Sequence, residues 1–187
     1  SHSVRRLPLA AFLMFGMIFL GISAEWGIGF WGAQFLEERL TVSAATGVAL
    51  MSVYFGGTIA GRIVVSRLLL RFDISTILIW AIVLGGMGLV ALWLLPWLAA
   101  AAVALAIAGA CLGNFFPLIL SIATRQPAEF LSKISAGATQ SVGLALLLAP
   151  LLLGSVGDKA GLVNAVGLLA IVPPVMLVVF LVSRRVR

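Results

Sequence analysis

This chain of 187 residues is 63% hydrophobic and 10% charged, with a mean hydropathy of +1.23. Such a composition excludes a soluble domain, which needs a polar surface, and indicates transmembrane helices. One cysteine (Cys111) and one histidine (His2) exclude a disulfide framework and a Cys/His metal centre, and we expect no cofactor. The net charge of +6 does not indicate a nucleic-acid partner, because the basic residues lie at the ends of apolar runs, where membrane orientation explains them.

Charged residues divide the chain into apolar spans. The uncharged stretch from Ile74 to Thr124 would measure about 77 Å as one helix, against about 30 Å for a bilayer core, so it must contain two spans. Pro96 marks the turn between them, since proline cannot continue a helix. We predict an all-α polytopic membrane protein with a six-helix domain over 7–183, a segment 1–6 before it and a basic tail, 184–187. The predicted spans are 7–36, 41–66, 74–95, 97–124, 134–157 and 162–183.

Two features concern the chain ends. The chain begins Ser-His-Ser without methionine, so either residues 1–3 are left from cloning or the chain is part of a longer protein. Six spans put both ends on one side, which holds nine basic residues against two, Arg39 and Lys159, on the other. By the positive-inside rule we expect both termini in the cytoplasm, and the membrane to be a bacterial inner (plasma) membrane. The nine are Arg5, Arg6, Arg67, Arg71, Arg125, Lys133, Arg184, Arg185 and Arg187.

One carboxylate, Glu25, interrupts the first span, which has no other charged residue between Leu7 and Leu36. A charge in hydrocarbon costs about 2.5–3.5 kcal/mol on insertion scales, so it usually faces a protein interior or a wet cavity. A carboxyl group in a dry setting can hold a proton near neutral pH, as a proton-coupled carrier needs. The alternative role for Glu25 is a structural hydrogen bond to a neighbouring helix.

Four further side chains are candidates for a substrate site. Trp26 adjoins Glu25 and could stack on a sugar-like solute, while Tyr54 needs a partner for its hydroxyl in mid-span. Asn114 and Gln140 are amides in apolar spans. Any of the four could line a cavity, and any could instead cross-link helices for about 0.6 kcal/mol.

Small residues recur four positions apart in two spans. Gly57 and Gly61 lie in the second, and Gly109 and Gly113 in the fourth. Between helices in lipid, small residues allow the backbones to approach closely. Arg62 follows Gly61 near the end of the second span, where its side chain could snorkel to the interface. We therefore predict tight helix packing at these glycines.

Several stretches resemble the C-terminal half of major facilitator superfamily transporters. The stretch 54–73, YFGGTIAGRIVVSRLLLRFD, is similar to their eighth helix, which runs through Gly-Arg into a basic cytoplasmic loop. Residues 24–36 look like their seventh helix, 113–121 (GNFFPLILS) like the tenth, and 150–161 (PLLLGSVGDKAG) like the end of the eleventh. The fucose-permease-like and sugar-type branches are the most similar.

The resemblance implies a six-helix half built as a 3+3 inverted repeat. Family members usually have twelve helices and bind substrate between two halves. A second six-helix half is therefore an expected partner, either the missing N-terminal half or a second copy in a parallel homodimer. The resemblance also assigns Arg62, Arg67 and Asp73 to gating, with Gly57 and Gly61 as conformational residues.

Enzymatic motifs are missing from the sequence. It contains no Gly-x-Ser-x-Gly nucleophile motif and no Gly-x-x-x-x-Gly-Lys-[Ser/Thr] phosphate loop. We expect half of a proton-coupled secondary transporter, a symporter for a small polar, sugar-like solute, with Glu25, Trp26, Tyr54, Asn114 and Gln140 at its site. The alternative is a non-transporting six-helix module, acting as a homo-oligomeric scaffold or channel.

Overall fold

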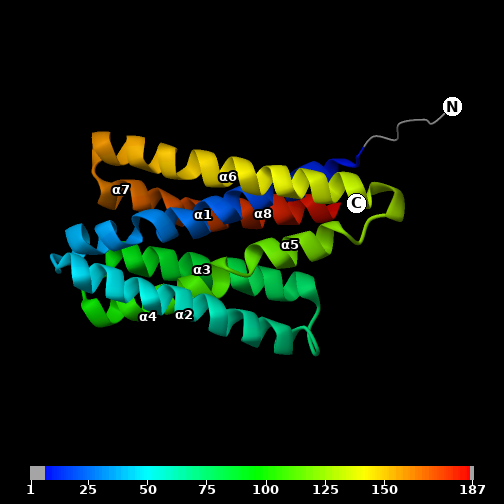
Figure 1. Cartoon of the computed structure of the whole chain (residues 1–187). Helices are drawn as coiled ribbons and strands as arrows, with labels where there is room; N and C mark the ends of the chain where they lie inside the picture. The colour runs from blue at the N-terminus through cyan, green and yellow to red at the C-terminus, as the bar shows by residue number, and fades with distance from the viewer. Residues whose placement is uncertain (1–6, 186–187) are drawn as a thin grey trace.

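The computed structural model describes residues 7–185, and six of its helical segments are long and apolar enough to cross a membrane. The predicted all-α, six-span class is thereby confirmed, and the chain is an integral membrane protein (Figure 1). The fourth span consists of two helices, the fifth begins with a 3-10 turn, and the sixth consists of three short pieces. The elements are α1 (Leu9–Leu40), α2 (Ala44–Leu68), α3 (Ile74–Leu94), α4 (Leu98–Leu112), α5 (Phe115–Ala123), η1 (Ala128–Phe130), α6 (Leu131–Ala160), α7 (Leu162–Gly167), η2 (Leu168–Ile171) and α8 (Val172–Arg185).

Helix α1 is longer than the predicted span, because it continues through Glu37, Glu38 and Arg39 to Leu40. The Arg39 guanidinium donates hydrogen bonds to the carbonyls of Trp93 (3.0 Å) and Leu94 (2.8 Å). These carbonyls belong to the last turn of α3 and have no partner within their own helix. Arg39 therefore ties the end of α1 to the end of α3.

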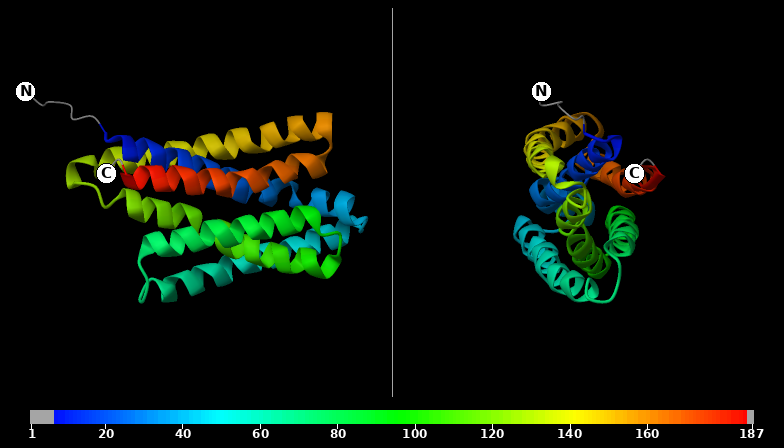
Figure 2. Two further views of the ribbon diagram at one scale, coloured as in Figure 1. Left: turned by 180° about the vertical axis from the view of Figure 1, so that it is seen from behind. Right: turned by 90° about the vertical axis from the view of Figure 1, so that its right-hand side faces the viewer.

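The beginning of α1 and the end of α8 lie at the same end of the bundle, here called the terminal end (Figure 2). The α2–α3 hairpin and the connection from α5 to α6 lie at this end as well. The described basic residues outside the spans gather there, and Arg39 and Lys159 lie at the opposite end. Those at the terminal end are Arg67, Arg71, Arg125, Lys133, Arg184 and Arg185.

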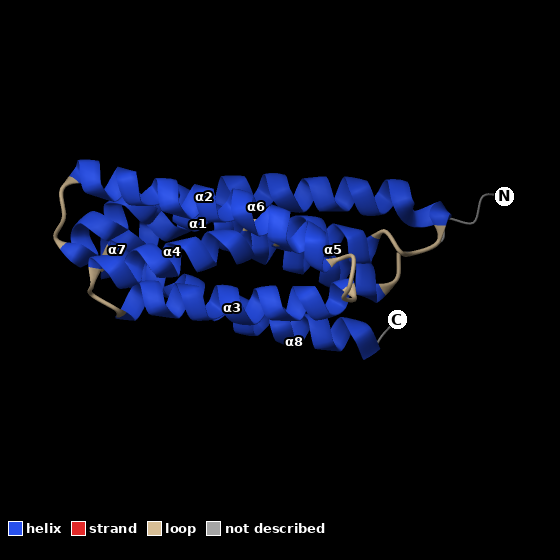
Figure 3. Ribbon diagram, turned by 90° about the horizontal axis from the view of Figure 1, so that it is seen from below, coloured by secondary structure: helices blue, strands red, loops and turns tan. Residues whose placement is uncertain are grey.

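The helices form two groups. Helix α4 packs between α2 and α3, whereas α1 packs chiefly against α6 and α8 (Figure 3). Helix α5 leaves the first group and contacts α1, α3 and α6. The fourth span thus belongs to both groups, one helix in each.

The α2–α4 interface depends on the predicted glycine pairs. A Cβ atom on Gly57 or Gly61 would collide with the backbone of α4 at Ala106 or Ala110. From the other side, a Cβ atom on Gly109 would collide with the carbonyl oxygen of Tyr54. The predicted close packing at these glycines is therefore present, and their conformational role stays a prediction.

A break between α4 and α5 interrupts the fourth span at Gly113 and Asn114. The backbone N–H of Asn114 donates to the Cys111 carbonyl (3.1 Å), three residues back, instead of to Ala110, four residues back. Pro117 has no N–H to donate to the carbonyl of Gly113, so the helix cannot continue regularly here. After the break the chain runs toward α1 as α5.

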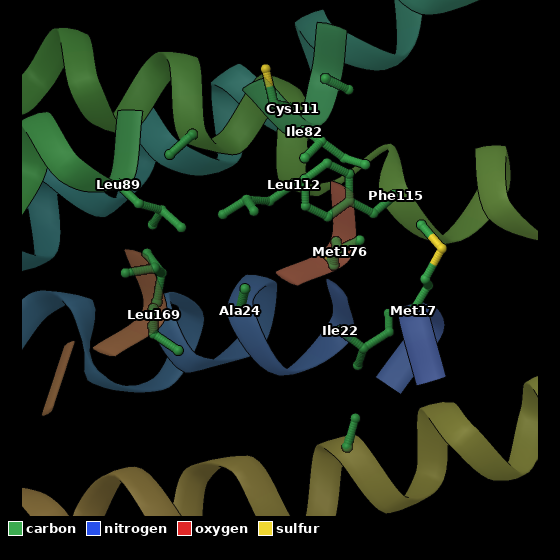
Figure 4. Close-up of a cluster of buried hydrophobic side chains, with 14 of the residues drawn as sticks. Met17, Ile22, Ala24, Ile82, Leu89, Cys111, Leu112, Phe115, Leu169 and Met176 are labelled. Atoms are coloured by element: carbon green, nitrogen blue, oxygen red, sulfur yellow. The ribbon is translucent and has the colours of Figure 1, made fainter. Parts of the chain in front are cut away.

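Phe115, the first residue of α5, fills the space between the two groups. Its ring lies beside Ile82 of α3, Leu112 of α4 and Met176 of α8 (Figure 4). Gly21 of α1 leaves room for it: a Cβ atom built there would lie 3.1 Å from the Phe115 Cβ. Phe115 is 1% exposed, so the break directs a large side chain into the centre of the bundle.

Two glycines of α2, Gly61 and Gly56, allow a matched test of the α2–α4 interface. We expect Gly61→Ala to lower the free energy of unfolding by about 1–3 kcal/mol, because its Cβ would overpack against the Ala110 backbone. Gly56→Ala should cause no loss, because nothing lies within 4 Å of its Cβ position. Thermal unfolding in mild detergent measures both; equal losses would show that α2 and α4 pack differently.

Candidate functional site

Three polar residues far apart in the sequence reach similar depths in the bundle. Measured along their spans from the end opposite the chain termini, Glu25, Arg62 and Asn114 lie about 23, 27 and 24 Å in. Arg62 is exposed and lies six residues before Leu68, the last residue of α2. The fold brings the three residues near one another, because Glu25 interacts electrostatically with Arg62, and Arg62 and Asn114 line the same hollow.

Glu25 is half-buried on α1. The Tyr54 hydroxyl donates a 2.9 Å hydrogen bond to the backbone carbonyl of Glu25, which fixes α2 against α1 at this point. Tyr54 is 1% exposed, so its hydroxyl serves this contact between helices. The Glu25 carboxylate interacts electrostatically with Arg62 of α2, with which it forms no direct ion pair in the described part of the chain.

A hollow of about 450 Å³ lies between α2 and α5. The polar residues of its lining are Arg62, Ser66, Asn114 and Ser121. Phe116 and Pro117 of α5 contribute to its apolar lining. This volume falls within the usual range for small-molecule sites, and its mixed lining suits a polar solute.

Asn114 compensates for the break that it occupies. Its side-chain amide donates to the Ala110 carbonyl at 2.7 Å, in place of the backbone N–H that is turned toward Cys111. The side chain is 2% exposed, so this bond satisfies a carbonyl inside the protein. Asn114 therefore has a definite structural role beside its predicted role as a substrate contact.

Trp26 and Gln140 lie farther from these residues. Trp26 is 39% exposed on α1 and packs against Phe30, with ring centroids 5.7 Å apart. Gln140 is exposed on α6, about 30 Å from the end opposite the termini, and so about one turn nearer the terminal end than Glu25. Helix α6, like α2, packs against α1, and Gln140 does not line the hollow that holds Arg62 and Asn114.

The predicted gating residues lie at the terminal end. Arg67 is exposed, and Asp73 caps α3 by accepting a 2.9 Å hydrogen bond from the Ser75 backbone N–H. This hydrogen bond, with the charge of Arg125 in addition, holds the pKa of Asp73 below its usual range. Asp73 pairs with Arg125 at 3.8 Å rather than with Arg67.

Two polar side chains of α1 have surroundings that the sequence did not predict. The Trp31 indole donates to the Pro150 carbonyl at 3.1 Å and links α1 to α6. The Ser23 hydroxyl is buried on α1 without a partner among the described residues. The stretch 24–36 that resembles the seventh helix includes Trp31, but the sequence predicted neither its hydrogen bond to α6 nor the burial of the Ser23 hydroxyl. Within the described chain, no group of three His, Cys, Asp or Glu side chains could hold a metal ion.

The helix order and packing are those of one six-helix half of a major facilitator-type transporter. A solved peptide transporter POT in complex with alafosfalin superposes with a TM-score of 0.84 and 23% identity, over 96% of this chain and 39% of that one. The POT family transporter PepTSo superposes with a TM-score of 0.79 and 16% identity, over 97% and 38%. These proteins are transporters rather than enzymes, and at such identity the likeness shows the fold.

Neither a protein-family model nor a curated protein matches the sequence. The chain spans about 39% of the length of the first solved transporter that it resembles. The solved neighbours are peptide transporters, so they support the transporter fold and give no support to the fucose-permease-like or sugar-type branch.

Two asparagines test whether Asn114 supports the break. Asn114 and Asn164 both donate to the carbonyl four residues back, at 2.7 and 2.8 Å, but Asn114 is buried and Asn164 is exposed. We expect Asn114→Ala to cost about 1–3 kcal/mol of stability, because it leaves a buried carbonyl unpaired. Asn164→Ala should stay within about 0.5 kcal/mol. Thermal unfolding is the measurement, and equal effects would contradict this role of Asn114.

Proposed function

We propose that the chain is one half of a proton-coupled secondary transporter, a symporter for a small polar solute, which works by alternating access with a second six-helix half. The observation that carries this proposal is that Glu25 and Arg62, two charged residues inside apolar spans, lie close enough to interact electrostatically. Each charge costs about 2.5–3.5 kcal/mol on insertion scales, and such residues mark substrate or proton pathways. A purely structural bundle has no need of either.

The distribution of burial supports a second half. In the second and fifth spans, α2 and α6 with its 3-10 turn, 22% of the most apolar window is buried, against 39–56% in the other four spans. These two least-buried spans also carry Arg62 and Gln140, which would be costly against lipid. A second helical unit that leaves a wet cavity over α1 would hydrate both side chains.

The charges of the site bear on the solute. Arg62 can bind a carboxylate, and Glu25 can bind an amino group or carry the coupling proton. This pair favours a solute with both charges, such as an amino acid or a short peptide, over a neutral sugar. Arg62 lines the hollow between α2 and α5, where the carboxylate of such a solute would bind.

The role of Glu25 can be tested in proteoliposomes that contain the chain together with its second half. We expect an inward proton gradient to drive accumulation of dialanine, and Glu25→Gln to reduce it to the level of protein-free vesicles, because glutamine cannot carry the proton. Glu38→Gln is the matched control: Glu38 accepts a 3.0 Å hydrogen bond from Gln34 on the exposed surface of α1, and its loss should leave accumulation unchanged.

Three results would count against the proposal. If accumulation survives Glu25→Gln, Glu25 does not carry the coupling proton. Uptake of glucose but not of dialanine would favour the sugar-like solute predicted from the sequence over an amino acid or a peptide. No uptake of any solute by the assembled protein favours a non-transporting module.

A further inference from the structure

A second hollow lies on the other side of α2, between α2 and α3. Its volume is about 510 Å³, and Ile107, Ala110 and Cys111 of α4 form its floor. It exists because the fourth span turns away at Gly113 and Asn114, so that no helix fills the space between α2 and α3 at the terminal end. We call it the α2–α3 groove.

The lining of the groove is almost wholly apolar. Small side chains such as Ala60, Gly61 and Ala81 widen it, and Trp80, which is 60% exposed, stands at its edge. An acyl chain of a lipid is apolar along its whole length, so it suits this lining.

The mouth of the groove is basic. Leu68 and Phe72 line the groove beside the hairpin, and Arg67 lies two turns after Ala60 on the same face of α2. Arg67 and Arg71 are exposed and form no ion pair within the described chain. The acidic residue of the hairpin, Asp73, is already engaged by Arg125 and the Ser75 N–H.

We propose that the α2–α3 groove binds an anionic phospholipid of the surrounding membrane. One acyl chain lies along the groove between α2 and α3, and the phosphate lies at Arg67 and Arg71. Basic clusters at the ends of transmembrane helices attract anionic lipid in this way, and each arginine strengthens binding about fivefold. This site is separate from the polar hollow, and its occupancy does not depend on transport.

Fluorescence quenching by brominated lipid tests the proposal on the reconstituted protein. Vesicles of phosphatidylcholine contain a minor fraction of brominated phosphatidylglycerol or, for comparison, brominated phosphatidylcholine. The fluorescence of Trp80 is obtained as the difference in tryptophan fluorescence between the wild type and Trp80→Phe. We expect Trp80 to be quenched more by the phosphatidylglycerol than by the same fraction of phosphatidylcholine.

Three variants identify the site. Arg67→Gln with Arg71→Gln should lower the preference for phosphatidylglycerol by about fivefold per arginine. Arg184→Gln with Arg185→Gln, at the same end of the bundle on α8, should leave it unchanged. Ala60→Phe, which fills the groove from an exposed position, should abolish it.

Four results would overturn the proposal. The first is equal quenching of Trp80 by the two brominated lipids, and the second is an equal loss of lipid preference in both double arginine variants. The third is a lipid preference that Ala60→Phe leaves intact, and the fourth is that neither lipid quenches Trp80. The last result would show that protein covers the groove.

Discussion

The interruption of the fourth span at Gly113 and Asn114 is the constraint on which the rest of the structure depends. Pro117 removes one helical hydrogen bond, and the Asn114 side chain satisfies the Ala110 carbonyl that the break leaves without its usual partner. Because α4 and α5 diverge here, one packs between α2 and α3 and the other against α1. Phe115 then joins the two groups at the centre of the bundle.

The same divergence produces two different environments on either side of α2. Between α2 and α5, Arg62 and Asn114 line a hollow of mixed polar and apolar residues that extends to Leu69 and Ile74 beside the α2–α3 hairpin. Where α5 has left α3, an apolar groove opens toward the basic hairpin. Val65 lines both hollows, so a single helix separates them. The proposed solute site and the proposed lipid site therefore lie on opposite sides of α2.

The sequence was sufficient for features that depend on local composition. Apolar length and the position of Pro96 predicted six spans, and four-residue spacing predicted close helix packing at Gly57 and Gly61, although it did not identify α4 as the partner. The sequence also indicated Glu25, because an isolated charge in an apolar span needs an explanation. Its likeness to a transporter half agreed with the fold of the solved neighbours, whereas the sugar-type branch gained no support.

The remaining features depend on contacts between distant residues. The packing of α2 against α1 sets the position of Arg62 near Glu25, which the distance of Arg62 from the end of its own span does not reveal. In the sequence, Asn114 is an amide in an apolar span, which fits a contact with a solute as well as a hydrogen bond to a backbone carbonyl. The structure shows the hydrogen bond, because the break in the fourth span leaves the Ala110 carbonyl for the side chain. Asp73 could pair with several arginines, and the fold selects Arg125, 3.8 Å away.

The central claim is that the exposed side of α6 borders a water-filled space beneath a second half. Reactivity of single cysteines toward a water-soluble methanethiosulfonate tests it in membranes, with Cys111 replaced by alanine. Gln140→Cys should react, and Val178→Cys, which is similarly exposed but lies on α8 at about 24 Å depth, should not. If both cysteines are unreactive, or both react equally, the side of α6 that carries Gln140 faces the same surroundings as α8 and the account is contradicted.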